Sequence, residues 1–258
     1  MTSFKNLNFL TSFKFFSLII LIIFILFNFL DVYLFKLSRS FHGIFFSFFK
    51  NIVDPISDIL DPLNLIIFCL LILLFNANIR LIIKNHKKCE IIKSKTNFSI
   101  EKINDLFAYI SLVCKHFILS LGIAGILCNV LKYFLGVSRP KYFFLEGYDR
   151  FDFFNIEHKV NSFPSGHTQA AFTFALLIII YSRRYFIFII IIAVLMGLSR
   201  IFMSMHFPSD LVSGAYLGSI IPVLLYKYNF KDKIDEIKKK HKVLFRDIMK
   251  LMFWRLFI

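Results

Sequence analysis

Two histidines and one carboxylate lie where apolar segments of the sequence begin or end. His206 and Asp210 are four residues apart, so one helical turn would bring their side chains together. In such a pair the carboxylate fixes the tautomer of the imidazole and stabilises its charged form. The other nitrogen of His206 could attack phosphorus, and His167 could protonate the leaving oxygen. These residues predict hydrolysis through a covalent histidine intermediate.

A second set of residues indicates an anionic substrate. Lys132, Arg139 and Arg200 are cations at the ends of apolar runs. Ser165 and Gly166 lie at the predicted start of a helix, where backbone N–H groups are free to bind an anion. Arginine can bind phosphate through two parallel hydrogen bonds, and lysine adds a point charge. A phosphate group is therefore the expected ligand.

The spacing along the chain places these groups at one depth. Lys132, Ser165, Arg200 and Asp210 each lie about 16–20 residues from the basic residues at the inner end of their apolar segments. At ~1.5 Å per residue, each group lies about 24–30 Å from the cytoplasmic face. Four separate helix ends are therefore expected to converge at the outer boundary of the membrane.

The apolar segments that must position these residues predict a membrane protein. Hydrophobic residues make up 58% of the 258 residues, more than a soluble chain of this length could bury. Six segments are long enough to cross a membrane, near residues 15–35, 62–82, 111–133, 165–182, 185–204 and 209–227. We predict an all-α polytopic helical bundle with six transmembrane helices. The net charge of +15 lies mostly at the ends of these segments, which favours membrane lipids over nucleic acid as partners.

Basic residues also predict the orientation of the chain. Lys and Arg gather at the N-terminus, after the second segment, between the fourth and fifth segments, and after the sixth. With six spans all four regions face one side, which should be the cytoplasm. Both termini are then cytoplasmic, and the site faces the exterior. The frequent Phe, Ile, Lys and Asn suggest an AT-rich genome, so we expect a bacterial inner membrane with the site facing the periplasm.

Residues 1–228 are expected to form the six-span domain and residues 229–258 a basic amphipathic cytoplasmic tail. The tail suits a helix on the anionic inner leaflet, although a simple solubilising tail remains an alternative. Its apolar stripe consists of Ile234, Ile237, Leu244, Ile248 and Leu251. A second interfacial helix is predicted from the apolar residues Phe41, Ile44, Phe45, Phe48, Phe49, Ile52 and Ile56.

Three ordered motifs resemble the signature of the type 2 phosphatidic acid phosphatase family. They are KYFLGVSRP from Lys132 to Pro140, PSGH at 164–167, and SRIFMSMHFPSD at 199–210, with no signature position substituted. The resemblance implies a phosphohistidine on His206, supported by Asp210, with His167 as general acid. It implies that the phosphate is held by Lys132, Arg139, Ser165, Gly166 and Arg200. It also implies that neither a metal nor another cofactor is used, and no carboxylate cluster for magnesium is evident at the outer level.

The expected activity is hydrolysis of a lipid phosphate or pyrophosphate, of the undecaprenyl pyrophosphate, lipid A or phosphatidic acid type. One alternative is a phosphotransferase that passes the phosphoryl group to a second envelope lipid. Another is a non-catalytic lipid-phosphate binder or transporter. The presence of both His206 and Asp210 argues against a binder, and a transporter would more often show paired repeats. The sequence gives no indication of the oligomeric state.

Overall fold

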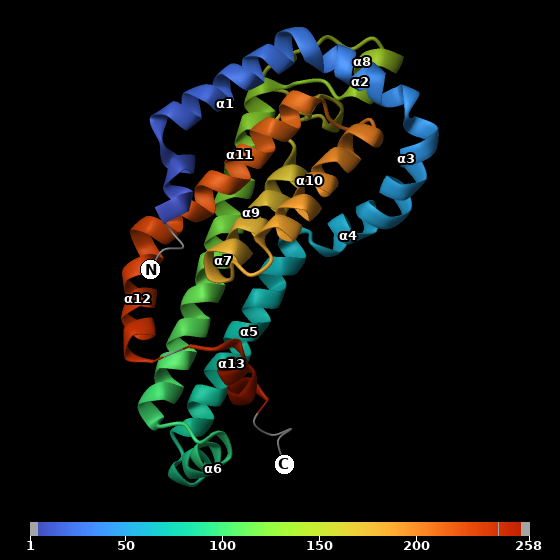
Figure 1. The fold of residues 1–258 in the computed structure, drawn as a ribbon. Coiled ribbons are helices and arrows are strands. Elements are labelled where there is room, and N and C mark those ends of the chain that lie inside the picture. The colour runs from blue at the N-terminus through green and yellow to red at the C-terminus, as the bar shows by residue number, and fades with distance from the viewer. Residues whose placement is uncertain (1–4, 242, 254–258) are drawn as a thin grey trace. The chain divides into compact units, whose positions relative to one another are not determined.

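The structure, a computed structural model, describes residues 5–241 and 243–253 (Figure 1). These residues form helices and connecting loops, and the one β-type contact among them is an isolated antiparallel bridge between Val137 and Phe151. The prediction of an all-α protein is confirmed. The chain divides into two compact units, Met1–Asn64 with Ser120–Leu224, and Leu65–Leu119 with Leu225–Ile258.

The first unit contains the N-terminal helices and the three apolar helices that follow the long loop after residue 145. Its helices are α1 (Phe13–Ile25), α2 (Asp31–Ser40), α3 (His42–Phe48), α4 (Asp54–Ile59), α8 (Pro140–Leu145), α9 (Gly166–Tyr181), α10 (Phe186–Phe202) and α11 (Pro208–Leu225). Single π-helical turns join α1 to α2 and α3 to α4, at Leu26–Leu30 and Phe49–Val53. A 3-10 helix, Lys5–Thr11, precedes α1, and a short one, His158–Val160, precedes α9.

The second unit contains the remaining helices. They are α5 (Pro62–Ile83), α6 (His86–Thr96), α12 (Lys231–Lys240) and α13 (Phe245–Met252), with a π-helical turn at Tyr226–Phe230. The long helix α7 (Ile100–Leu135) contributes its first part to this unit and its last part to the first unit.

Within residues 5–241 and 243–253, four helical stretches are long and apolar enough to cross a membrane, so the chain is an integral membrane protein. They are Phe13–Ser40, Phe45–Ile83, Ile100–Leu135 and Pro208–Lys240. These stretches include four of the six predicted spans. The other two predicted spans coincide with shorter apolar helices, Gly166–Tyr181 and Phe186–Phe202, and a total of six crossings stays a prediction.

Small residues allow α9 to pack closely against α10 and α11. A Cβ atom at Gly214 of α11 would lie 2.4 Å from the carbonyl oxygen of Ser165, and one at Gly218 would lie 2.2 Å from that of Gln169. On α10, Gly197 also faces Thr168, and a Cβ there would make a tight contact of 3.2 Å with the Thr168 methyl group. The backbones therefore approach each other where a side chain would not fit, as small residues permit in membrane helices. This packing sets the start of α9 directly against the start of α11.

The predicted interfacial segment 41–56 is helical in the structure, although the side chain of Ile44 lies outside the described residues. Phe49 and Val53 are buried. The Phe49 ring stacks on Phe202 of α10 with ring centroids 4.5 Å apart. Phe45, Phe48, Ile52 and Ile56 stay exposed. One side of the segment thus packs on α10, and the other presents apolar side chains outward.

The apolar stripe of the tail packs largely within the second unit. Ile234, Ile237 and Leu251 are buried, and Leu251 belongs to a core that includes Ile92 and Phe107. Lys102 also pairs with Asp247 of α13, with 2.8 Å between Nζ and Oδ2. The sequence pattern suggested that this stripe meets the inner leaflet. The difference arises because the neighbouring helices offer an apolar surface of their own.

Candidate active site

The loop after α10 and the first turn of α11 bring His206 and Asp210 together. The distance from His206 Nδ1 to Asp210 Oδ2 is 3.4 Å, and both side chains are buried. Asp210 Oδ2 also accepts hydrogen bonds from the Phe207 backbone N–H at 2.8 Å and from the Ser162 hydroxyl at 2.5 Å. Ser162 Oγ lies 3.4 Å from His206 Nδ1 as well. The carboxylate is therefore fixed from two sides beside the imidazole, and Nε2 of His206 is the nitrogen that faces away from it.

The start of α9 adjoins this pair. Ser165 is the N-cap residue of α9, and its hydroxyl oxygen accepts a hydrogen bond from Thr168 Oγ1 at 2.9 Å. The backbone N–H of Ser165 donates to the carbonyl oxygen of Asp210 at 3.0 Å. Lys132 lies over this turn, because its Nζ is 3.6 Å from the position that a Cβ of Gly166 would occupy. The ammonium group of Lys132 is therefore within van der Waals reach of the start of α9.

The two predicted arginines are both buried, and their partners differ. Nη1 of Arg139 lies 3.7 Å from the sulfur of Met205, and its Nε makes no hydrogen bond among the described residues. Arg200 forms an ion pair with Asp54 of α4, and its Nε donates to Ser199 Oγ at 3.2 Å. A buried arginine with an unused donor can bind an anion, whereas Arg200 already has a carboxylate partner.

A pocket of about 340 Å³ opens beside these groups within the first unit. Its polar and charged lining includes Lys132 and His167 together with Ser57 and Asp61, and Gly166 also lines it. The remaining lining is largely apolar, from Leu60, Pro62, Leu63, Gly125, Cys128, Ala170 and Met196, together with Asn129 and Gln169. Asp61 is also the cap of α5, since its Oδ1 accepts from the Leu63 N–H at 2.9 Å. The pocket combines cationic, acidic and apolar surface, as an amphiphilic ligand requires.

Electrostatics favour the neutral form of the central histidine. Burial lowers the pKa of His206 well below its ordinary value, and the positive groups around it act in the same direction. These groups are Lys132, Arg139, His167 and Arg200. Burial likewise lowers the pKa of Arg139. These four groups come from all three motifs. The backbone contact between Ser165 and Asp210 joins the second motif to the third.

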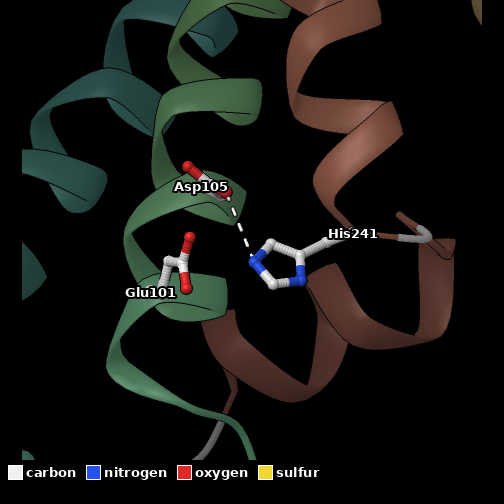
Figure 2. Close-up of side chains that lie close together, drawn as sticks. All are labelled: Glu101, Asp105 and His241. Atoms are coloured by element: carbon white, nitrogen blue, oxygen red, sulfur yellow. Dashed lines mark ion pairs between the residues drawn. The ribbon is translucent and has the colours of Figure 1, made fainter.

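Metal-type ligands gather elsewhere in the part of the chain that the structure describes. Figure 2 shows Glu101 and Asp105 on α7 and His241 after α12, all in the second unit, with their ligand atoms within 4.8 Å of one another. His241 Nε2 lies 3.4 Å from Asp105 Oδ2. When His241 is protonated, its ion pair with Asp105 links the end of α12 to α7. It shares no residue with the site around His206.

Three residues at the site were not anticipated from the sequence. Asp31 is the only carboxylate inside the first predicted span, a signal that could have revealed it. Asp54 belongs to a group of acidic residues that the sequence placed merely on the outer side. Ser162 carries no distinguishing signal, because a serine in a loop is common and its contact with Asp210 depends on the tertiary fold.

Fold and site together define a helical integral membrane protein with a buried histidine–aspartate pair surrounded by cations. Residues 114–234 match the PAP2 superfamily. The matched segment contains all eight predicted site residues, from Lys132 to Asp210.

Curated relatives are similar over parts of the chain. A lipid A 1-phosphatase of Rhizobium etli is 29% identical over 121 residues, which are 46% of this chain and 52% of that protein. An undecaprenyl-diphosphatase of Sulfolobus acidocaldarius is 32% identical over 132 residues, 48% of this chain and 59% of that protein. The bacitracin transport permease protein BcrC of Bacillus licheniformis is 35% identical over 72 residues, 28% and 36% of the two chains. The chain thus spans about half the length of the first of these relatives. No solved structure gives a significant match.

Proposed function

We propose that this protein is a membrane phosphatase that hydrolyses a lipid phosphate or pyrophosphate through a phosphohistidine on His206, without a metal ion. The observation that carries the proposal is the gathering of two buried arginines, a half-buried lysine and a helix start around a histidine–aspartate pair. Such a set binds a phosphoryl group and offers it a nucleophile. The names of the relatives, lipid A 1-phosphatase and undecaprenyl-diphosphatase, support the same reaction class.

The first step of the reaction assigns a role to each imidazole. Nε2 of His206 attacks phosphorus, and the N–P bond forms as the bond to the leaving oxygen breaks. Asp210 stabilises the positive charge that develops on the imidazole, because its carboxylate lies 3.4 Å from Nδ1. His167, which lines the pocket, gives its proton to the leaving oxygen. In the second step His167 takes a proton from water, whose oxygen attacks phosphorus and releases phosphate and free His206.

The phosphate cradle consists of Lys132, Arg139, Ser165, Gly166 and Arg200. Preorganised donors of this kind stabilise the charge of the transferring phosphoryl group, which is the main work of the protein in phosphoryl transfer. Arg139 supplies an unused buried donor, and Lys132 supplies a charge over Gly166. For Arg200 the phosphate must compete with Asp54.

The pocket and the relatives support the proposed substrate class. The pocket adjoins apolar helices and has a mixed polar and apolar lining, which suits a lipid headgroup entering from the outer leaflet. Lipid A-type phosphates and undecaprenyl pyrophosphate are the first candidates, followed by phosphatidic acid. We place the protein in a bacterial inner membrane, with six crossings, both termini in the cytoplasm and the site facing outward.

Phosphate release from a panel of purified lipids tests the proposal. The wild-type protein should release phosphate from at least one lipid, and His206→Ala should retain less than about one per cent of that activity while still inserting into membranes. A chelator should leave the rate unchanged, and vanadate should inhibit as a mimic of the five-coordinate phosphorus. A labelled donor distinguishes products: label in free phosphate supports a phosphatase, whereas label in a second lipid would indicate a phosphotransferase.

A further inference from the structure

The loop that carries His206 is held at both ends by one helix, α2. This loop runs from the end of α10, at Phe202, to the start of α11, at Pro208. The first residue of α2 is Asp31 and the last but one is Arg39. They bind the two flanks of the loop, and neither belongs to the motifs that identify the site.

Asp31 binds the start of α11. Its carboxylate accepts hydrogen bonds from the backbone N–H of Ser209 at 2.9 Å and from the hydroxyl of Ser209 at 2.5 Å. The first N–H groups of a helix have no partner inside that helix, and a negative charge there is favoured by the helix dipole. Asp31, which belongs to α2, therefore caps the start of α11. The residue that it binds, Ser209, directly precedes Asp210.

Arg150, from the loop after α8, neutralises the Asp31 carboxylate. Its Nη2 lies 2.5 Å from Asp31 Oδ2, and its guanidinium lies over the Phe207 ring, 3.8 Å from the ring centroid. The Asp31 side chain is fully buried. A buried carboxylate is costly unless it is paired. The Asp31 side chain therefore depends on its contacts with both Ser209 and Arg150.

Arg39 binds the end of α10. Its Nη1 donates to the carbonyl oxygen of Phe202 at 3.2 Å and to the hydroxyl of Ser204 at 3.0 Å, and its Nη2 donates to the carbonyl oxygen of Ile201. The last carbonyl groups of a helix lack partners inside the helix, and a positive charge is favoured there. Arg39 therefore caps α10 just before the loop, with a geometry that only a guanidinium fork provides.

We propose that Asp31 and Arg39 are positioning residues, and that α2 holds the His206 loop in the geometry needed for attack on phosphorus. The inference rests on the proposed function, because a nucleophile must exist for its position to matter. A displacement of about 1 Å in a reacting group can cost ~100-fold in rate. Both residues bind the flanks of the loop, so their loss should affect the rate of reaction more than the binding of substrate.

Substitutions at the two ends of α2 test the inference in the full-length protein in nanodiscs. Asp31→Asn removes the charge that Arg150 requires, and Arg39→Lys keeps the positive charge but removes the fork. Each should lower kcat about 10- to 100-fold while KM for the best lipid changes less than about threefold. The matched controls are Lys36→Gln, an exposed cation of the same helix, and Asp247→Asn, a paired carboxylate of the second unit. Both controls should keep wild-type kcat.

Three outcomes would overturn the inference. One is a kcat for both test variants equal to that of the controls. Another is a rise in KM with unchanged kcat, which would place α2 in substrate binding. The third is a loss of activity that is fully explained by a smaller fraction of folded protein, as measured by size-exclusion chromatography. If Asp31→Asn fails to fold, Arg39→Lys decides alone. A wild-type protein that releases phosphate from no lipid would instead overturn the proposed function.

Discussion

His206 must satisfy two opposing electrostatic demands in the proposed reaction. Attack on phosphorus requires a neutral imidazole, and burial together with the surrounding cations lowers its pKa to favour that form. The phosphorylated ring carries positive charge, which needs a nearby anion. Asp210 supplies it at 3.4 Å from Nδ1, and bound phosphate offsets the cations that oppose it. The same cations therefore keep the free nucleophile neutral and attract its target.

The lowered pKa of His206 can be measured directly. We expect its imidazole to stay neutral as the pH falls through 6.5, the ordinary value for histidine, and to gain a proton only at lower pH. Protonation removes the nucleophile, so activity should be lost only when the pH falls below the lowered pKa of His206. Activity should therefore persist at pH values below 6.5. NMR titration of protein carrying isotope-labelled histidine reports the midpoint, and His206→Gln assigns the signal. A midpoint at or above 6.5 would contradict the electrostatic account.

The ion pair between Asp54 and Arg200 predicts a gain in affinity when it is removed. In the free protein the Asp54 carboxylate is paired with the Arg200 guanidinium, the group that the phosphate should bind. Asp54→Asn should therefore lower the inhibition constant of inorganic phosphate, by about three- to fivefold for a partly exposed pair. The control is Asp58→Asn on the same helix, which removes an exposed carboxylate. Weaker phosphate binding in Asp54→Asn would show instead that Asp54 orients Arg200 for the substrate.

At the scale of helices, the contact between α9 and α11 joins two of the motifs. Gly218→Ala places a methyl group 2.2 Å from the carbonyl oxygen of Gln169, so the helices must separate. We expect a loss of about 1–3 kcal/mol in stability, as for other overpacked sites, and a lower kcat. Gly122→Ala in α7 is the matched control, because a Cβ there meets nothing within 4 Å. Thermal unfolding in detergent measures both variants; equal melting temperatures would mean that the contact is looser than the structure describes.

The sequence predicted the helices and motifs because their signals are local. Apolar length predicted the long helices, and the PSGH motif predicted the helix start at which Ser165 caps α9. Contacts between distant segments have no such signal. The pairing of Asp31 with Ser209 spans 178 positions, and nothing in either neighbourhood indicates the other. The role of α2 at the site could therefore be recognised only from the three-dimensional structure.

At the scale of the whole molecule, all predicted site residues fall in one compact unit. The second unit contains the basic tail, α6 and the first part of α7, which together hold much of the positive charge of the chain. Because α13 packs on helices of that unit, the tail is held there by buried contacts as well as by charge. The boundary predicted at residue 228 remains a prediction. It is close to residue 225, where the chain enters the second unit.

The orientation of the chain can be tested with single reactive cysteines. All four native cysteines are buried, so an impermeant thiol reagent should find little background. Glu157 in the loop before α9 and Lys87 in α6 are both exposed. If the basic regions face the cytoplasm, Glu157→Cys should be labelled in intact cells, whereas Lys87→Cys should react only after permeabilisation. Labelling of both positions from outside would indicate an even number of crossings between them. Labelling of Lys87→Cys alone in intact cells would invert the topology and place the phosphate site on the cytoplasmic face.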